Sequence, residues 1–129
     1  MVSYGGGANS TALLIGLHQH RIPVDLILFA DTGGEHPHTY AYLDIMDRWL
    51  KDHGMPPITR VYKTTRDGKR LTLEDECLQS CSLPSIACGF KRCSLKHKIG
   101  PQEKSCNHYP PCQKAWAAGK RVVKFIGYD

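Results

Sequence analysis

Three consecutive glycines near the start of the chain are the first residues that suggest chemistry. The stretch VSYGGGANSTALL places them between a short apolar segment and residues with the apolar spacing of a helix. Glycine has no Cβ, so another atom can approach the N–H groups of such a backbone closely. A strand, a glycine loop and a helix N-terminus form an anion site, because amides and the positive end of the helix dipole converge there. The pattern favours phosphate binding at residues 5–11, and the alternative is a tight turn capped by Asn9 or Ser10.

The spacing after the glycines excludes two common nucleotide motifs. A P-loop ends in Gly-Lys-Ser/Thr, whereas here Ala8-Asn9-Ser10-Thr11 follows, and a dinucleotide fingerprint needs a third glycine at a distance where none stands. The loop instead resembles the PP-loop of the ATP pyrophosphatases and the phosphoadenosine-phosphosulfate reductase group, written Ser-Gly-Gly-Lys-Asp-Ser-Thr. It keeps both glycines, the Ser and the Thr, and departs at Gly5, Ala8 and Asn9. Asn9 lacks the charge that Mg²⁺ prefers in its oxygen ligands, so Mg²⁺ is a disfavoured cofactor.

Two further segments extend this resemblance along the chain. LFADTGGEHPHTYAYLDIM is similar to the Phe-x-Asp-Thr-Gly segment and following helix of these reductases. CSLKHKIGP, residues 93–101, looks like their Cys-Ser/Thr-x-x-x-Lys-x-x-Pro element. The resemblance implies an adenine nucleotide, ATP or a sulfonucleotide, as the bound cofactor or substrate.

The expected nucleotide contacts come from the ends of the first two strands and the loops after them. Backbone groups near residues 29–31 are expected at the adenine, with Asp31 or Thr32 near the ribose or the reacting phosphate. A side chain at Gly6 is expected to block the anion and leave the fold largely intact. The nucleotide and phosphate contacts predicted from the sequence are Ser3, Tyr4, Gly5, Gly6, Gly7, Asn9, Ser10, Thr11, Phe29, Ala30, Asp31, Thr32 and Gly33.

A cluster of cations within the third motif is the candidate site for the far anion of the nucleotide. It contains Lys91, Arg92, Lys96 and Lys98. Charge-assisted hydrogen bonds would hold a phosphate or sulfate there. The alternative is an ordinary solvated basic face.

Three residues are candidates for catalysis. Cys93 lies in the matched motif beside cations and is the best candidate for a reactive thiol. Asp31 and His36 follow the second strand, where they would touch a ligand phosphate or leaving group. Asp31 has the alternative role of capping its local turn.

The six cysteines do not match a strong metal motif. Their spacings are C-x3-C, C-x4-C and C-x5-C, and none is the C-x2-C pair of zinc or iron–sulfur sites. Free or buried thiols are the preferred interpretation, and a zinc or iron–sulfur site is the alternative. The metal therefore stays unassigned.

The elements that must position these residues alternate along the chain. Residues 24–30 and 58–64 read as strands, residues 10–18 and 40–53 as helices, and residues 122–128 as a last strand. The segment between residues 66 and 111 reads as turns and short helices. This alternation predicts an α/β, Rossmann-like doubly wound and mostly parallel sheet with helices on both faces, in a single PP-loop domain spanning residues 1–129.

Composition limits the partners. The 129 residues carry a net charge of +5, which favours anionic ligands without indicating nucleic acid. We find no apolar run of membrane-spanning length and no secretion signal, so we expect a cytoplasmic protein without membrane contact. The expected partners are a small-molecule nucleotide, a thiol reductant if the protein is a reductase, and further copies in a homo-oligomer.

Three functions stay open on this evidence. The first is a PP-loop protein of the reductase group acting on a sulfonucleotide. The second is a PP-loop ATP pyrophosphatase that adenylates an RNA or a metabolite, and the third is a nucleotide-binding module or sensor without catalysis. Reductases of this group carry a C-terminal cysteine segment, and here the sequence stops at KFIGYD. We therefore expect either a chain truncated at its C-terminus or a chemistry other than thiol-driven reduction.

Overall fold

The computed structural model describes residues 1–83 and 93–127 and has an α/β fold. Its strands form a four-stranded sheet in the order β3-β2-β1-β4, and all neighbours are parallel. The strands are β1 (Val2–Tyr4), β2 (Ile27–Ala30), β3 (Ile58–Val61) and β4 (Phe125–Ile126). The predicted parallel α/β sheet is thereby confirmed. The arrangement is compatible with a Rossmann-like fold, although the sheet is small and incompletely wound.

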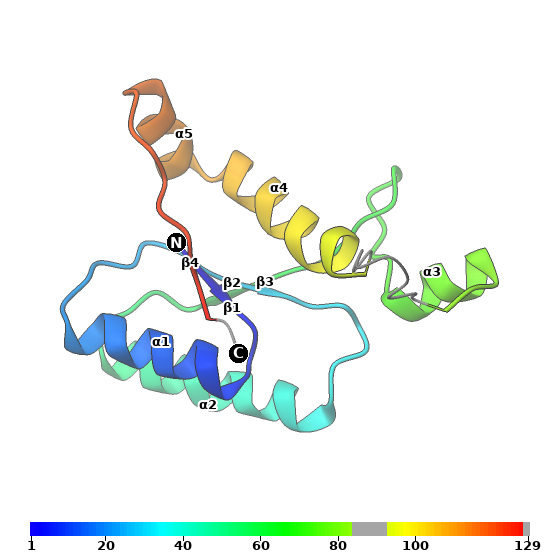
Figure 1. The fold of residues 1–129 in the computed structure, drawn as a ribbon, viewed down its shortest axis with the longest axis horizontal. Helices are drawn as coiled ribbons and strands as arrows, with labels where there is room; N and C mark the ends of the chain where they lie inside the picture. The colour runs from blue at the N-terminus through cyan, green and yellow to red at the C-terminus, as the bar shows by residue number, and fades with distance from the viewer. Residues whose placement is uncertain (84–92, 128–129) are drawn as a thin grey trace.

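Helices lie on both sides of this sheet (Figure 1). On one side are α1 (Ala8–Gln19) and α2 (Pro37–Asp52), and on the other are α4 (Gly100–His108) and α5 (Pro110–Ala117). The π-helix η2 (Ser94–Ile99) leads directly into α4, and α3 (Leu73–Ser80) lies beyond one end of the sheet. Within the described ranges, none of the helices has the length and apolarity needed to cross a bilayer.

The boundaries of several elements differ from those that the sequence predicts. The helix expected from residue 10 already begins at Ala8, because Gly7 is its N-cap and neither Asn9 nor Ser10 has that role. The helix expected from residue 40 begins at Pro37, with His36 as N-cap and proline in the first turn. The strands are shorter than expected and span residues 27–30, 58–61 and 125–126. The pairing of β4 is limited to two residues of β1, Val2 and Ser3.

The main hydrophobic core lies between the sheet and the pair α1 and α2. Side chains alternate along a strand, so Val2 and Tyr4 of β1 face this layer together with Ile27 and Phe29 of β2. Leu28 points to the opposite face, which η2 and α4 cover. Ile58 of β3 belongs to the same cluster, and the helices contribute Leu14, Leu17, Leu43, Met46 and Leu50.

A buried hydrogen bond links the central strand to the first helix. The Tyr4 hydroxyl lies 3.0 Å from Thr11 Oγ1, and both residues are almost fully buried. Burial raises the pKa of Tyr4, so the hydroxyl stays protonated and can donate. The contact fixes the start of α1 relative to the end of β1, and therefore the shape of the loop between them.

Replacing Tyr4 tests this contact. We expect Tyr4→Phe to lower the free energy of unfolding by about 1–2 kcal/mol, because it leaves the Thr11 hydroxyl buried without its partner. Urea denaturation measures the change, and the exposed Tyr62→Phe is the control with the same chemical difference. In the double variant with Thr11→Val, the two losses should be clearly less than additive; strict additivity would contradict the coupling.

Candidate functional site

The candidate site lies at the edge of the sheet where the parallel strands end. β1 leads into the glycine loop, β2 leads into Asp31, and β4 is followed by Gly127. β2 and β3 follow β1 on one side of it in the sheet, and β4 pairs with β1 on its other side. The strand order therefore reverses between β1 and β4. Ligands of open parallel sheets bind at such a point. The glycine loop and the end of β4 therefore flank the candidate site.

Gly6 is held where no side chain fits. Its φ is +74°, and a Cβ built on it would lie 2.7 Å from Thr39 Cγ2 on α2 and 3.6 Å from Phe29 Cε2. The expectation that a side chain at Gly6 leaves the fold intact is therefore wrong, because residue 6 packs against α2. Gly7 differs, since a Cβ there meets no described atom within 4 Å.

The start of α1 presents its backbone to the loop. Gly7 is the N-cap with φ −97°, and its carbonyl accepts Thr11 N at 3.1 Å. Among the described residues, no side chain caps this end of the helix. The first turn of a helix has no carbonyl of its own for its amides, so this end attracts an anion.

The two hydroxyls that were expected to touch the anion are used within the fold. Ser10 Oγ donates to the Gly7 carbonyl at 3.0 Å, and Thr11 Oγ1 bonds to Tyr4. Both side chains are buried. They shape the glycine loop, and an anion would meet backbone amides first.

Gly127 closes the loop from the other side. A Cβ on it would lie 3.0 Å from Asn9 C and from Ser10 N, so the chain after β4 packs directly on the first turn of α1. This contact joins residues far apart in the sequence. Its one sequence signal is a glycine directly after the last apolar run.

Asp31 is placed at the end of β2 and is buried, with 8% of its surface exposed. Its Oδ1 accepts from Gly33 N at 2.9 Å and from the Tyr40 hydroxyl at 2.8 Å, and its Oδ2 pairs with Arg70 at 2.8 Å. Burial and the hydrogen bond to Asp31 raise the pKa of Tyr40. These contacts support the turn-capping alternative for Asp31. Its contact with a nucleotide stays a prediction.

The loop after Asp31 connects the end of β2 to η2 and α3. The Thr32 hydroxyl donates to Glu35 Oε1 at 3.1 Å, and Lys98 Nζ lies 3.1 Å from the same oxygen. Gly33 packs against Thr72, the N-cap of α3, and a Cβ on Gly33 would lie 2.6 Å from the Thr72 methyl. Lys98 thus reaches the predicted nucleotide loop, although a carboxylate of this chain already pairs with it.

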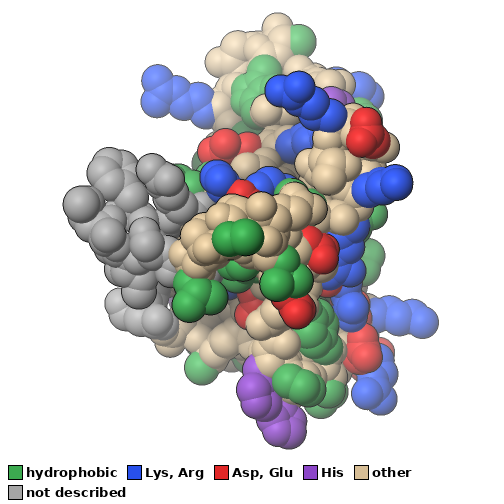
Figure 2. Space-filling view, turned by 90° about the vertical axis from the view of Figure 1, so that its right-hand side faces the viewer, with side chains coloured by type: hydrophobic (Ala, Val, Ile, Leu, Met, Phe, Trp, Pro, Cys, Tyr) green, Lys and Arg blue, Asp and Glu red, His purple; other side chains and the backbone are tan. Residues whose placement is uncertain are grey.

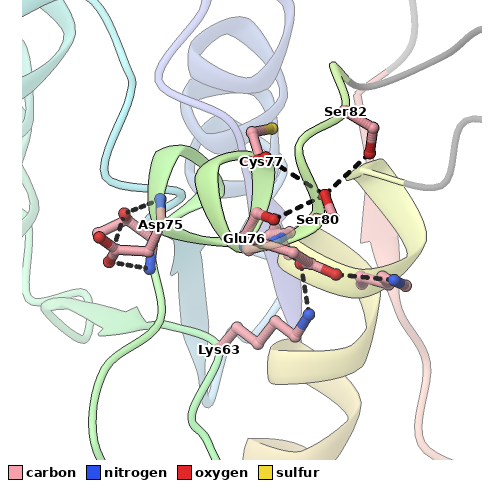
Figure 3. Close-up of polar contacts among 9 residues, drawn as sticks. Lys63, Asp75, Glu76, Cys77, Ser80 and Ser82 are labelled. Atoms are coloured by element: carbon pink, nitrogen blue, oxygen red, sulfur yellow. Dashed lines mark hydrogen bonds and ion pairs between the residues drawn. The ribbon is translucent and has the colours of Figure 1, made fainter.

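Glu76 on α3 is the centre of a charged cluster that the sequence does not reveal (Figure 3). Lys63 Nζ and His97 Nε2 each lie 2.5 Å from Oε2, and Lys96 Nζ lies 2.7 Å from Oε1. These partners, Lys63 and Lys96 first, lower the pKa of Glu76 to about 2. The cluster ties α3 to η2 and to the chain after β3. His97 is almost completely buried, and its Nδ1 has no hydrogen-bond partner among the described residues.

A small cavity beside this cluster is lined by lysines. Its volume is about 140 Å³, and Lys63, Lys96 and Lys104 are among its lining residues. Lys104 Nζ donates to Thr64 Oγ1 at 3.2 Å. In the part of the chain that the structure describes, no acidic side chain lines it. Lys63 and Lys96 already pair with Glu76, so an anion in this cavity would compete with that carboxylate.

The other expected site residues have varied positions. His36 is exposed, and its Nδ1 accepts from His38 N at 3.3 Å as the cap of α2. Cys93 is half-buried and directly precedes η2. Ser3, Phe29 and Ala30 are strand residues, and the contacts of their backbone with adenine stay predictions. Lys91 and Arg92 lie outside the described residues.

The described residues outside this edge show neither a uniformly charged face in Figure 2 nor a group of metal ligands. On the face shown in Figure 2, lysine and arginine side chains lie interspersed with acidic ones. Within residues 1–83 and 93–127, no three His, Cys, Asp or Glu side chains are arranged to hold a metal ion. The five described cysteines are free thiols, and Cys88 lies outside the described residues.

Comparison of the chain with protein-family models, curated proteins and solved structures gave no match. The resemblance to PP-loop proteins therefore depends on the motifs of this chain alone. The proposed function below therefore depends on these motifs and on the geometry of the sheet edge.

The pH dependence of stability tests the Glu76 cluster. The unfolded chain binds a proton at an ordinary glutamate pKa, and the folded chain binds it only near pH 2. The stabilisation is therefore complete above about pH 5 and is lost as the pH falls toward 2. We expect Glu76→Gln to cost about 1–3 kcal/mol at pH 7 and progressively less below pH 5, as measured by urea denaturation.

The exposed Glu103→Gln on α4 is the matched control and should follow the parent at every pH. Curves of the parent and Glu76→Gln that stay parallel from pH 7 to pH 3 would contradict the assigned ion pairs.

Proposed function

We propose that this chain binds an adenine nucleotide with a phosphate on the glycine loop, as a Rossmann-like PP-loop protein of the phosphoadenosine-phosphosulfate reductase group. One observation carries the proposal. The loop that resembles a PP-loop joins the central strand of a parallel sheet to the N-terminus of α1, beside the point where the strand order reverses. Both features favour an anion at the same place.

The backbone is the phosphate-binding part of this site. The first-turn amides and the dipole of α1 attract the anion, whereas the Ser10 and Thr11 hydroxyls hold the loop in shape. Gly7 leaves its outer side open to a ligand. The arrangement needs no metal to hold a phosphate, in agreement with Asn9 at the position where PP-loops carry Asp.

The basic residues above the sheet favour a nucleotide with a second anion. Lys98 forms an ion pair with Glu35 in the loop after β2, which places it beside that loop. Lys96 lines the cavity that Lys63 and Lys104 also line. A sulfonucleotide or an adenosine bisphosphate carries a phosphate or sulfate that such cations would bind. We therefore favour a sulfonucleotide over ATP as the ligand.

A nucleotide-binding module without catalysis is the second candidate, and Asp31 favours it. Both oxygens of this carboxylate already accept hydrogen bonds or an ion pair, so it has little capacity left to bind or move a proton. Ala8 also removes the lysine that PP-loops carry. If the protein is an enzyme, Cys93 and an external thiol reductant are the candidates for reduction.

A side chain at Gly7 tests the phosphate site. We expect Gly7→Val to weaken binding of adenosine 3′,5′-bisphosphate by about tenfold or more, because the new methyl groups occupy the side from which the anion approaches the amides. Isothermal titration calorimetry without Mg²⁺ measures the binding, and thermal unfolding checks the fold.

Gly16→Val is the matched control, because it makes the same change on the same helix with no described atom within 4 Å. Equal affinity of parent, Gly7→Val and Gly16→Val would show that the glycine loop is a turn only.

The lysines distinguish a sulfonucleotide site from an adenylating one. We expect Lys96→Met and Lys98→Met each to cost about 1–3 kcal/mol in binding adenosine 3′,5′-bisphosphate, and much less in binding adenosine 5′-monophosphate. The bisphosphate affinity should also fall with salt. Calorimetry with adenylyl sulfate and ATP, with and without Mg²⁺, completes the series.

Lys114→Met on α5 is the control for a lost surface charge. Tight ATP binding that requires Mg²⁺ and is unaffected by Lys96→Met and Lys98→Met would contradict the sulfonucleotide site and favour the adenylating function.

A further inference from the structure

Two buried cysteines lie in contact at the opposite edge of the sheet. Cys106 Sγ on α4 and Cys112 Sγ on α5 are 3.3 Å apart. Their residues are 8% and 6% exposed. Met1, which precedes β1, lines the cavities beside both cysteines, and Asp25 and Leu26, which precede β2, line the cavity beside Cys112, so the pair lies away from the glycine loop.

The backbone between the two cysteines is fixed by hydrogen bonds. Tyr109 N donates to the Cys106 carbonyl at 3.1 Å, and Cys112 N donates to the Tyr109 carbonyl at 3.0 Å. The Tyr109 hydroxyl donates to the Asp25 carbonyl at 3.2 Å, which anchors the turn to the chain before β2. A disulfide would require the two sulfurs to approach by about 1.2 Å from their distance of 3.3 Å.

Both cysteines line cavities of the structure. Cys112 lines a cavity of about 360 Å³, and Cys106 lines one of about 310 Å³. Met1 and Val122 border both cavities. Each cysteine of the pair therefore borders a cavity from which a low-molecular-weight disulfide would approach.

The environment of the pair makes its oxidation slow at neutral pH. Burial, followed by the contact with Cys106, raises the pKa of Cys112 to about 11. Only the thiolate attacks a disulfide, so the rate of exchange should rise as the pH increases toward that value. Asp25 and the N-terminal amine are the other charged groups that act on this thiol.

We infer that Cys106 and Cys112 form a reversible dithiol–disulfide pair that is oxidised by small disulfides. One thiolate attacks a sulfur of the small disulfide, its S–S bond breaks, and one thiol leaves while a mixed disulfide forms on the protein. The second cysteine then attacks the protein sulfur of that mixed disulfide and releases the second small thiol. The protein is oxidised by two electrons, the small disulfide is reduced, and the two cysteine protons end on the two released thiols.

The remaining described cysteines serve as internal references. Cys81 directly follows α3 and is exposed, and its Sγ lies near the Leu78 carbonyl. Cys77 and Cys93 are half-buried. Among the described residues, Cys106 and Cys112 are the pair whose sulfurs are in contact.

The experiment treats the reduced full chain with glutathione disulfide at about pH 8.5, because the thiolate fraction increases above neutral pH. Peptide mapping by mass spectrometry is expected to find a crosslinked peptide containing Cys106 and Cys112, without glutathione on either. The oxidised chain should also unfold about 5–10 °C higher than the reduced chain, and dithiothreitol should reverse both effects.

Two variants sharpen the result. Cys112→Ser should retain glutathione on Cys106, because no second thiol resolves the mixed disulfide, whereas Cys81→Ser should form the Cys106–Cys112 crosslink like the parent. Persistent glutathione on Cys106 or Cys112 of the parent, or a crosslink that joins either of them to another cysteine, would overturn the inference. The peptide map of the parent decides it even if Cys112→Ser fails to fold.

Discussion

The structure depends on the close approach of Thr39 to Gly6. At this point the glycine loop after β1, the side chain of Phe29 on β2 and the first turn of α2 meet, and a Cβ on residue 6 would be strained and would displace the Thr39 methyl. The left-handed φ of Gly6 turns the chain from β1 into α1, and the Tyr4–Thr11 hydrogen bond holds that turn. The backbone direction at the start of α1, on which any phosphate site here depends, is therefore set by core packing.

The charges around the sheet edge are largely balanced within the chain itself. Asp31 pairs with Arg70, Glu35 with Lys98, and Glu76 with Lys63, Lys96 and His97. A ligand with a second anion must therefore compete with carboxylates for Lys96 and Lys98. At the glycine loop, by contrast, the described hydrogen bonds are to the Gly7 carbonyl and to Tyr4.

Much of the fold could be predicted from local patterns, and the long-range contacts could not. Apolar runs and helical spacing indicated the strands and helices correctly, because periodicity reports burial directly. The exact ends were missed where a cap decided them, as at Gly7 and His36. Arg70 and Glu76 gave no local signal, since each acts through a partner that is distant in the sequence.

β4 connects the two edges of the sheet. Phe125 N donates to the Met1 carbonyl at 2.9 Å, beside the cavities next to Cys106 and Cys112. Two residues further on, Gly127 packs on the backbone of Asn9 and Ser10. A strand of two residues has few bonds of its own, so its position depends on what holds each end. The position of β4 therefore depends on the Met1 contact at one end and on the packing against α1 at the other.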